Sequence, residues 1–187
     1  MDPRAARHLV VMGRPGAGKG TQAQRLARHL GLVHLSTGAM LRRAIEAGSE
    51  LGHLARPYVE AGELVPDDVM LGVVAEALRA PEVVTQGFLL DGFPRTAEQA
   101  GGLLAQPGRL DAAIDIDLPV DEARRRLQAR GRADDRPEVI DHRLAVDADE
   151  SGPLLLLLRR AGLLVEVDGL GSEDEVFTRI LTALEAR

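Results

Sequence analysis

Cysteine and tryptophan do not occur in this sequence of 187 residues, and aromatic residues make up only 2% of it. Without cysteine the chain can form no disulfide, no thiolate nucleophile and no cysteine-ligated zinc site, so we expect no zinc. No apolar run approaches the roughly 20 residues that span a membrane, and residues 1–12 contain no apolar segment of signal-peptide length. We therefore expect a cytoplasmic protein without a membrane partner.

A surplus of positive charge is also missing. The chain has 29 acidic and 23 basic residues, which gives a net charge of −6 at pH 7. Dedicated nucleic-acid binders usually carry a basic balance, so we expect no nucleic-acid partner, and any anion site must be local. Lysine occurs only once, at Lys19, and the other basic residues are arginine.

The composition that remains is 45% apolar and 28% charged, which is typical of a globular protein with one good core. A chain of this length has room for small lobes inserted into one main domain. No additional apolar stripe indicates a subunit interface, so we expect a monomer.

The most informative stretch is Gly13–Thr21, with the sequence GRPGAGKGT. The apolar run Leu9–Met12 precedes it, and apolar positions at helical spacing follow it, which predicts a strand, a loop and a helix. Glycines let backbone N–H groups turn toward an anion, the helix start adds its positive dipole, and the lysine reaches the outer phosphates. The stretch therefore predicts a phosphate-binding loop. The common pattern has Ser or Thr directly after the lysine, whereas here Gly20 intervenes before Thr21.

Apolar runs of strand length alternate with segments of helical periodicity along the rest of the chain. This alternation predicts an α/β fold with a five-stranded parallel sheet and right-handed crossovers. The predicted strands are 8–12, 33–35, 87–91, 112–118 and 163–168. The predicted helices begin near residues 20, 37, 51, 66, 97, 119 and 172, and we interpret the leucines at 154–158 as part of a core helix. Ser172 and Glu175 predict a capping box at the start of the last helix.

The loop Gly92–Thr96, with the sequence GFPRT, follows a strand that we expect to be buried. Open α/β sheets bind ligands at the carboxyl ends of their strands, so this loop is a second candidate site.

Seven arginines lie between residues 124 and 143. We interpret Arg124 and Arg125 as surface residues that pair with nearby carboxylates. The spacing leaves two alternatives for Arg126, Arg130 and Arg132: they either do the same or converge on a phosphate. The five histidines show no paired ligand spacing, so we interpret them as structural or exposed.

Four separated motifs together resemble the adenylate kinase family of the short-lid kind. GRPGAGKGTQ is similar to the family's GxPGxGKGTQ, including the glycine after the lysine. LSTGAMLR is similar to LSTGDMLR, GFLLDGFPRTAEQ to GFLLDGFPRTxxQ, and ARGRADDRPEVIDHRL to the short lid and its following helix. The resemblance implies a P-loop NTPase-like fold in three α/β/α layers. It implies a core of residues 1–35, 66–129 and 145–187, a lobe for the nucleoside monophosphate at 36–65, and a lid and hinge at 130–144.

The activity that the resemblance implies is reversible, magnesium-dependent transfer of the γ-phosphoryl group of ATP to AMP, which yields two ADP. Lys19 would place its positive charge at the β and γ phosphates, and Asp91 would hold magnesium through water. The other residues implied for ATP are Gly16, Ala17, Gly18, Gly20, Thr21, Arg126, Arg130 and Gly169.

Arg95 would bind the phosphate of AMP, and Arg132 and Arg143 would converge on the phosphates between the two nucleotides. The resemblance also implies that Asp134 and Asp135 act near the transferring group, beside Arg130. The other residues implied for AMP are Thr37, Arg42, Glu63, Leu64, Val65, Gly92, Phe93, Pro94 and Gln99.

The sequence departs from the family pattern at several positions. Ala39 stands where the motif has an aspartate that helps to order the waters of magnesium. Asp147, Ser151, Leu157 and Leu158 stand where the resemblance leads us to expect tyrosines and a threonine after the lid. We expect Arg14, at a loop position often filled by a small residue, to point to solvent. With so few aromatic rings, we expect adenine to pack against Arg126 or aliphatic carbons.

Two alternatives stay open at this point. A UMP or CMP kinase of the same fold is the nearest, although Thr37, Thr96 and Gln99 favour AMP. A non-catalytic nucleotide-binding regulator is the other, indicated only by Ala39. We favour an enzyme because Lys19 and the arginines of the motifs are present.

Overall fold

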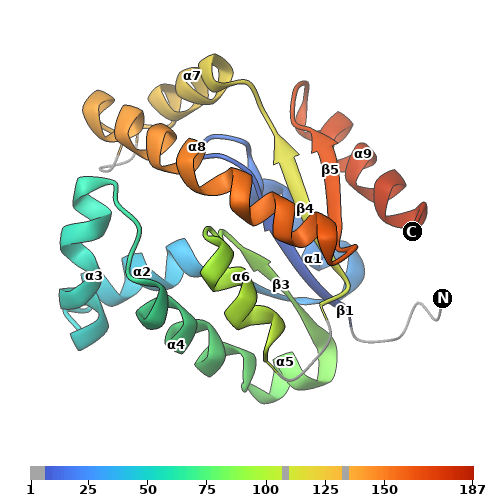
Figure 1. The fold of residues 1–187 in the computed structure, drawn as a ribbon, viewed down its shortest axis with the longest axis horizontal. Coiled ribbons are helices and arrows are strands. Elements are labelled where there is room, and N and C mark those ends of the chain that lie inside the picture. Colours follow the sequence, from blue (N-terminus) through green and yellow to red (C-terminus); the bar gives the residue numbers. More distant parts are fainter. Residues whose placement is uncertain (1–6, 107–109, 132–134) are drawn as a thin grey trace.

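One parallel sheet with strand order β2-β3-β1-β4-β5 organises the structure, a computed structural model (Figure 1). The structure describes residues 7–106, 110–131 and 135–187. The strands are β1 (Arg7–Met12), β2 (Val33–Ser36), β3 (Gly87–Asp91), β4 (Ala112–Asp117) and β5 (Leu164–Asp168). Each predicted strand is confirmed to within one residue at either end. In this order β1 lies between β3 and β4, so the chain passes to opposite sides of β1 and leaves a crevice at its carboxyl end.

Helices connect these strands, and one more follows the last strand. The helices are α1 (Lys19–Leu30), α2 (Thr37–Glu46), α3 (Glu50–Ala61), α4 (Asp67–Leu78), α5 (Pro81–Gln86), α6 (Ala97–Leu104), α7 (Val120–Arg130), α8 (Pro137–Arg160) and α9 (Glu173–Glu185). The short helix α5 was not predicted, because six residues are too few to show a helical period. The predicted capping box between Ser172 and Glu175 is present at the start of α9.

Alternate residues of the strands face opposite layers of helices, as expected for a sheet that is covered on both sides. Leu9 and Val11 of β1 pack in a core cluster with side chains from α1, α7 and α9. Val10 and Met12 pack in a second cluster with side chains from α4, α5 and α6. The three-layer α/β/α arrangement that was predicted is therefore present.

The long helix α8 contributes to both clusters. Ile140 and Leu144 in its first half belong to the cluster with α1 and α7, whereas Leu154 and Leu158 in its second half belong to the other cluster. The leucine run is thus part of a core helix, as predicted, and the helix continues through Pro153. The middle of α8 passes from one layer to the other near the carboxyl ends of the strands (Figure 1).

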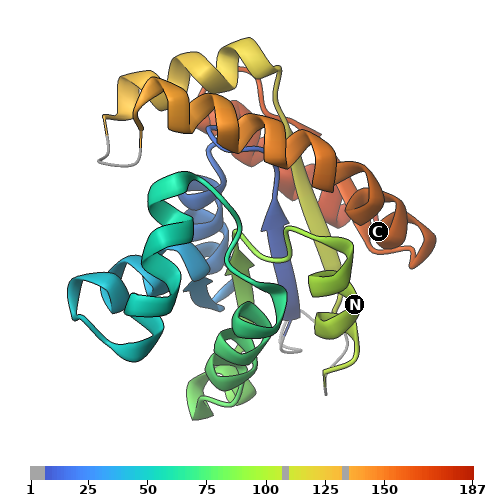
Figure 2. The ribbon, with the colours of Figure 1, turned by 60° about the vertical axis from the view of Figure 1, so that its left-hand side comes forward.

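Helices α2 and α3 form a projection at the edge of the molecule, on the same side as the first turns of α8 (Figure 2). The two helices meet at Gly52, where an added Cβ would lie only 2.0 Å from the backbone oxygen of Ala44. Ser49 caps α3 by accepting a hydrogen bond from the Gly52 N–H. A side chain at position 52 would therefore push the two helices apart.

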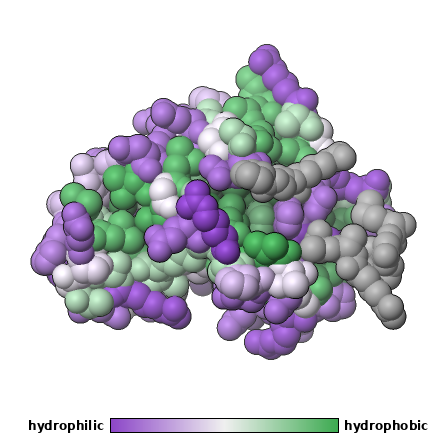
Figure 3. Space-filling view, turned by 90° about the horizontal axis from the view of Figure 1, so that it is seen from below, coloured by the Kyte–Doolittle hydropathy of each residue, from purple (hydrophilic) through white to green (hydrophobic). Residues whose placement is uncertain are grey.

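Exposed large apolar side chains are distributed over several elements rather than gathered on one. Leu54, Val84, Leu104, Leu156 and Leu170 come from α3, α5, α6, α8 and a loop. On the face seen from below, hydrophilic residues surround the hydrophobic areas (Figure 3). Within the described ranges, no helix combines the length and the hydrophobicity needed to span a membrane.

We predict that Gly52→Ala weakens the packing of α2 against α3. Overpacking of this kind costs about 1 to 3 kcal/mol, so the melting temperature should fall and amide hydrogens of α2 and α3 should exchange faster. Gly72→Ala in α4 is the matched control, because no atom lies within 4 Å of its added Cβ. Since alanine favours helix over glycine by about 1 kcal/mol, the control should be neutral or slightly stabilising. Equal melting temperatures for the two variants would contradict the close contact.

Candidate active site

The glycine loop leaves β1 and enters α1, as the sequence predicts. Gly13, Gly16 and Gly18 have φ angles of 130°, 88° and 85°, which side chains rarely adopt. A Cβ at Gly13 would lie 2.4 Å from the Ile116 backbone oxygen, and one at Gly16 would lie 2.6 Å from that of Ala123. Glycine is thus required both by backbone conformation and by the close approach of β4 and α7.

Lys19 is the first residue of α1, and its side chain turns back over the loop. Its Nζ donates hydrogen bonds to the backbone oxygens of Gly13, at 2.6 Å, and Arg14, at 2.9 Å. Burial of the ammonium and the neighbouring charge of Arg95 lower the pKa of Lys19 to about 8, although Asp91 opposes the shift. The carboxylates of Asp91 and Asp147 only partly offset the cost of this buried charge, so an anion in the loop would stabilise it further.

Asp91 ends β3 directly beside the start of α1. Its Oδ2 would lie 3.4 Å from a Cβ at Gly20, and it lies 3.7 Å from Nε2 of His34. Burial favours the neutral acid, but the influence of His34 and Lys19 outweighs it, and the pKa of Asp91 lies below its usual value. Asp91 is therefore a carboxylate beside the start of α1, at the phosphate loop.

A hollow that we call the central cleft opens over the loop between β4 and α8. Lys19, Arg95 and Arg143 line it together with Arg14. Arg14 points into the cleft, with its Nη2 3.7 Å from Oδ1 of Asp117 and its side chain 27% exposed. The expectation that Arg14 faces solvent was wrong: Arg14 lines the cleft and lies beside Asp117 at the end of β4, whose own side chain is 73% exposed.

Carboxylates also line the central cleft. Asp115 of β4 is 8% exposed, and burial together with Asp117 raises its pKa to about 6. Burial also raises the pKa of Asp147 of α8, although Lys19 and Arg14 oppose this shift. The cleft therefore combines cations with carboxylates that are costly to ionise. Sequence reasoning did not assign Asp115 a role in the site; its position at the carboxyl end of a strand was the available signal.

A second hollow, the lobe pocket, adjoins the central cleft on the side of α2 and α3. It contains most of the residues that the sequence predicts for the acceptor: Thr37, Arg42, Glu63, Leu64, Val65, Gly92, Arg95, Gln99 and Arg143. Gly62, Leu64, Gly92, Arg95 and Arg143 line both hollows. The two hollows therefore meet at a pair of arginines.

Two predicted acceptor residues differ in placement from the rest. The side chain of Phe93 is only 1% exposed and packs in the core, so aromatic character there serves packing. Pro94 lines the central cleft. Thr37 is 1% exposed, and its hydroxyl lies 3.2 Å from the backbone oxygens of both Asp91 and Gly92.

Asp67, in the first turn of α4, is a site residue that sequence reasoning missed. Its carboxylate accepts hydrogen bonds from Thr96 Oγ1, at 2.9 Å, and from Gln99 Nε2, at 2.7 Å. Gln99 in turn accepts a hydrogen bond from the backbone N–H of Arg95 at 2.8 Å. In the sequence, Asp67 looks like an ordinary acidic residue at a helix start, and only the fold brings it to this loop.

The lid arginines are held by a buried carboxylate. Asp135, whose side chain is 1% exposed, accepts two hydrogen bonds from Arg130, at 2.6 and 2.8 Å, and lies 3.6 Å from Arg143. Arg130 is not among the described residues that line the two hollows. Arg132 and Asp134, which the sequence analysis also assigned to this site, lie outside the described residues.

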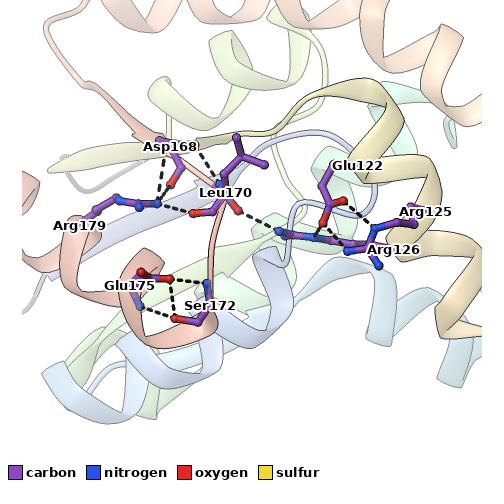
Figure 4. Close-up of polar contacts among 9 residues, drawn as sticks. Glu122, Arg125, Arg126, Asp168, Leu170, Ser172, Glu175 and Arg179 are labelled. Atoms are coloured by element: carbon purple, nitrogen blue, oxygen red, sulfur yellow. Dashed lines mark hydrogen bonds and ion pairs between the residues drawn. The ribbon is translucent and has the colours of Figure 1, made fainter.

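A third hollow lies on the outer side of the glycine loop, against α7 and the start of α9. The predicted ATP residues that line it are Gly16, Ala17, Gly18, Thr21 and Arg126. Arg126 donates to Glu122 at 2.7 Å and to the backbone oxygen of Gly169 at 3.2 Å (Figure 4). Gly169, also predicted for ATP, therefore contacts this site through Arg126.

The arginines of α7 do not converge on a single point. Arg126 pairs with Glu122, whereas Arg130 pairs with Asp135. Arg125 pairs with Glu122 as predicted, and Arg124 pairs with Asp141 of α8 rather than with the carboxylates nearest in sequence. Each guanidinium has a partner within reach on its own side of the helix, so spacing alone could not decide the alternatives.

The projection and α8 are in contact beside these hollows. His142 of α8 lies 2.5 Å from Glu63, and a Cβ at Gly62 would lie 3.0 Å from side-chain atoms of Val139 and Arg143.

Among the described residues, no group of three or more His, Cys, Asp or Glu side chains is placed to hold a metal ion.

Comparison with known proteins agrees with this geometry. The adenylate kinase family model matches residues 11–162. The chain belongs to the adenylate kinase family. It is 46% identical over 185 residues to an adenylate kinase of Stenotrophomonas maltophilia strain R551-3, a match that covers 95% of this chain and 98% of that protein. It is 44% identical over 180 residues to an adenylate kinase of Mycobacterium ulcerans strain Agy99, with coverage of 94% and 98%.

Membership in the adenylate kinase family identifies the chain as a nucleotide-binding phosphotransferase. The relatives span nearly the whole chain and share one name, so neither alternative, the pyrimidine monophosphate kinase or the non-catalytic regulator, is favoured.

We predict that this adenylate kinase takes up protons when nucleotide binds in mildly alkaline buffer. The pKa of Lys19 near 8 leaves much of the lysine neutral at about pH 8.5, and phosphates placed beside it would raise that pKa. Nucleotide affinity should therefore fall as the pH rises through about 8. Isothermal titration calorimetry in two buffers of different ionisation enthalpy should detect uptake of up to one proton. Lys19→Met should abolish it, and an unchanged proton count would assign the titration to another group.

We also predict that Asp115→Asn stabilises this adenylate kinase at neutral pH. The folded pKa near 6 exceeds the ordinary value of 3.8, so the aspartate disfavours folding once it is ionised, and wild-type stability falls as the pH rises from about 4 to 6. Urea unfolding should show the variant more stable by roughly 1 to 3 kcal/mol at about pH 7, with no difference below about pH 4. Asp149→Asn, which removes an exposed carboxylate from α8, is the control. Equal gains in both variants would contradict the assignment.

Proposed function

We propose that the chain catalyses reversible, magnesium-dependent transfer of the γ-phosphoryl group of ATP to AMP, giving two ADP. The observation that carries the proposal is the meeting of the central cleft and the lobe pocket at Arg95 and Arg143, beside Lys19. A donor and an acceptor bound on either side of this point would have their phosphates adjacent. A protein that bound only one nucleotide at a time would not need two hollows that meet at cationic side chains.

The donor would occupy the glycine loop. Backbone N–H groups of the loop and Lys19 would bind its phosphates, and the third hollow beside Arg126 would take the base. Asp91 would hold the magnesium of MgATP through water, because magnesium keeps several waters and takes few protein carboxylates when phosphates bind it. Magnesium would neutralise charge on the phosphates. The further residues assigned to ATP are Gly16, Ala17, Gly18, Gly20, Thr21, Arg130 and Gly169.

The acceptor would occupy the lobe pocket. Arg95 would bind the phosphate of AMP, and Gln99, which is 2% exposed, would contact the base. The further residues assigned to AMP are Thr37, Arg42, Glu63, Leu64, Val65, Gly92, Phe93, Pro94, Arg132 and Arg143. The roles of Phe93, Pro94 and Arg132 rest on the resemblance, and those of the other residues rest on the resemblance together with the lining of the pocket.

Transfer would need positioned cations and exclusion of water rather than a covalent nucleophile. Charge spreads over the phosphoryl oxygens in a loose transition state, and guanidinium groups stabilise it without losing a proton. Arg130, Arg132, Arg143, Asp134 and Asp135 would complete the catalytic group. In the free protein Asp135 binds Arg130 and lies near Arg143, so phosphates would compete with this carboxylate for the arginines.

Water would compete with AMP for the phosphoryl group, so the proposal includes closure of two mobile parts over a fixed core. The parts are the lobe at 36–65 and the lid and hinge at 130–144, and the core consists of 1–35, 66–129 and 145–187. The contact between Glu63 and His142 supports their approach to each other. We further propose a monomer that acts in the cytoplasm, supported by the scatter of exposed apolar side chains.

Phosphorus NMR of the protein with magnesium, ATP and either AMP, UMP or CMP tests the proposal. ADP should form rapidly with AMP and far more slowly with the pyrimidine nucleotides. Lys19→Met should slow the reaction by at least about 1,000-fold, the scale expected for loss of a phosphate-binding cation. Arg28→Met, which removes an exposed cation from the same helix, should leave the rate unchanged. Equal ADP formation with all three acceptors, or an undiminished rate in Lys19→Met, would overturn the proposal.

A further inference from the structure

We propose that Asp67 is a positioning residue that sets the preference of the acceptor pocket for adenine over 6-oxopurines. It would do so by fixing which end of the Gln99 amide faces which neighbour. The inference rests on the proposed function, because it concerns the base of the acceptor nucleotide.

The amide of Gln99 is held at both ends. Its Nε2 donates to Oδ1 of Asp67 at 2.7 Å, and its Oε1 accepts from the backbone N–H of Arg95 at 2.8 Å. Gln99 is 2% exposed and lines the lobe pocket. Its side chain therefore lies inside the structure with one face of the amide toward the acceptor.

The two partners demand the same orientation of the amide. An ionised carboxylate can only accept a hydrogen bond, and a backbone N–H can only donate one. In the reversed orientation, oxygen would face the oxygen of Asp67 and NH2 would face the N–H of Arg95. Both hydrogen bonds would become repulsive contacts in a buried place, where unsatisfied polar groups are costly.

Thr96 fixes the carboxylate itself. Its Oγ1 accepts the backbone N–H of Gln99 at 3.1 Å as the cap of α6, so its own hydrogen is available for Oδ2 of Asp67 at 2.9 Å. Asp67 is therefore tied to the loop through both of its oxygens. The chain from Thr96 to Asp67 to Gln99 leaves the amide one orientation.

Orientation decides which purine the amide can recognise. After binding Asp67 and Arg95, Gln99 keeps one N–H to donate and one lone pair to accept. Adenine offers a donor at N6 and an acceptor at N1, which match this pair. Hypoxanthine and guanine offer the reverse, an acceptor at O6 and a donor at N1. A glutamine free to turn over would serve both kinds of base, whereas a fixed one serves adenine.

The first experiment uses the wild-type protein and compares three acceptors with ATP: AMP, purine riboside monophosphate and IMP. Purine riboside monophosphate lacks any group at C6, so it loses one hydrogen bond, whereas IMP meets repulsion at two positions. The expected order of kcat/KM is AMP, then purine riboside monophosphate, then IMP. An IMP value equal to or above that of purine riboside monophosphate would overturn the inference, because the amide would not be fixed.

The second experiment replaces the carboxylate of Asp67, which can only accept hydrogen bonds, with an amide that can also donate them. In Asp67→Asn the side chain can pair with either end of the Gln99 amide, so the ratio of kcat/KM for AMP to that for IMP should fall by about 3- to 10-fold. The change should appear mainly as a lower KM for IMP, with little change for purine riboside monophosphate. Asp68→Asn removes the same charge from the same helix turn, but Asp68 is exposed and accepts a hydrogen bond from the N–H of Val69 rather than from Gln99, so the ratio should not change.

A double-mutant cycle tests whether Asp67 acts through Gln99. Adding Asp67→Asn to Gln99→Ala should leave the AMP to IMP ratio of the single Gln99→Ala variant unchanged. A further fall in the double variant, or an unchanged ratio in Asp67→Asn alone, would overturn the inference. If instead the wild type transferred no phosphoryl group to AMP, the proposed function itself would fail, so the two failures are distinguishable.

Discussion

Cations gathered in one cleft repel each other, and the architecture of this adenylate kinase depends on how that repulsion is balanced before substrate arrives. Lys19, Arg95 and Arg143 line one hollow in a protein whose net charge is negative. Carboxylates stand beside them: Asp91 at the glycine loop and Asp135 between two lid arginines. An anionic substrate would take over this compensation, so binding energy and the ordering of the arginines are coupled.

Two aspartates near the glycine loop show how position in the fold decides the behaviour of chemically identical groups. Asp91 sits near His34 and Lys19, and its pKa is lowered despite burial, whereas Asp115 sits near Asp117 and its pKa is raised. Asp91 ends β3 and Asp115 lies in β4, on opposite sides of β1. The difference follows from the nearest charges: those beside Asp91 favour its ionised form, whereas burial and Asp117 make Asp115 costly to ionise.

Most of the fold was predictable because its signals are local. Apolar runs placed every strand to within one residue, and the glycines of the loop predicted a backbone that the φ angles of Gly13, Gly16 and Gly18 bear out. The motif resemblance named as a group most of the residues that line the lobe pocket. What the sequence did not reveal are contacts between residues far apart in the chain: Asp67 with Gln99, Arg14 with Asp117 and Arg124 with Asp141. Such pairs depend on how helices pack, and no local period encodes them.

Helix α8 is anchored on one side of the sheet through Ile140 and Leu144 and on the other through Leu154 and Leu158, with Arg143 and Asp147 facing the cleft. Both halves of α8 are packed in core clusters, so the helix cannot shift in one cluster without affecting the other. An attraction between Arg143 and bound phosphates would therefore act on both halves of the molecule. Helix α8 therefore couples the packing of the two core clusters to the binding of a ligand in the central cleft.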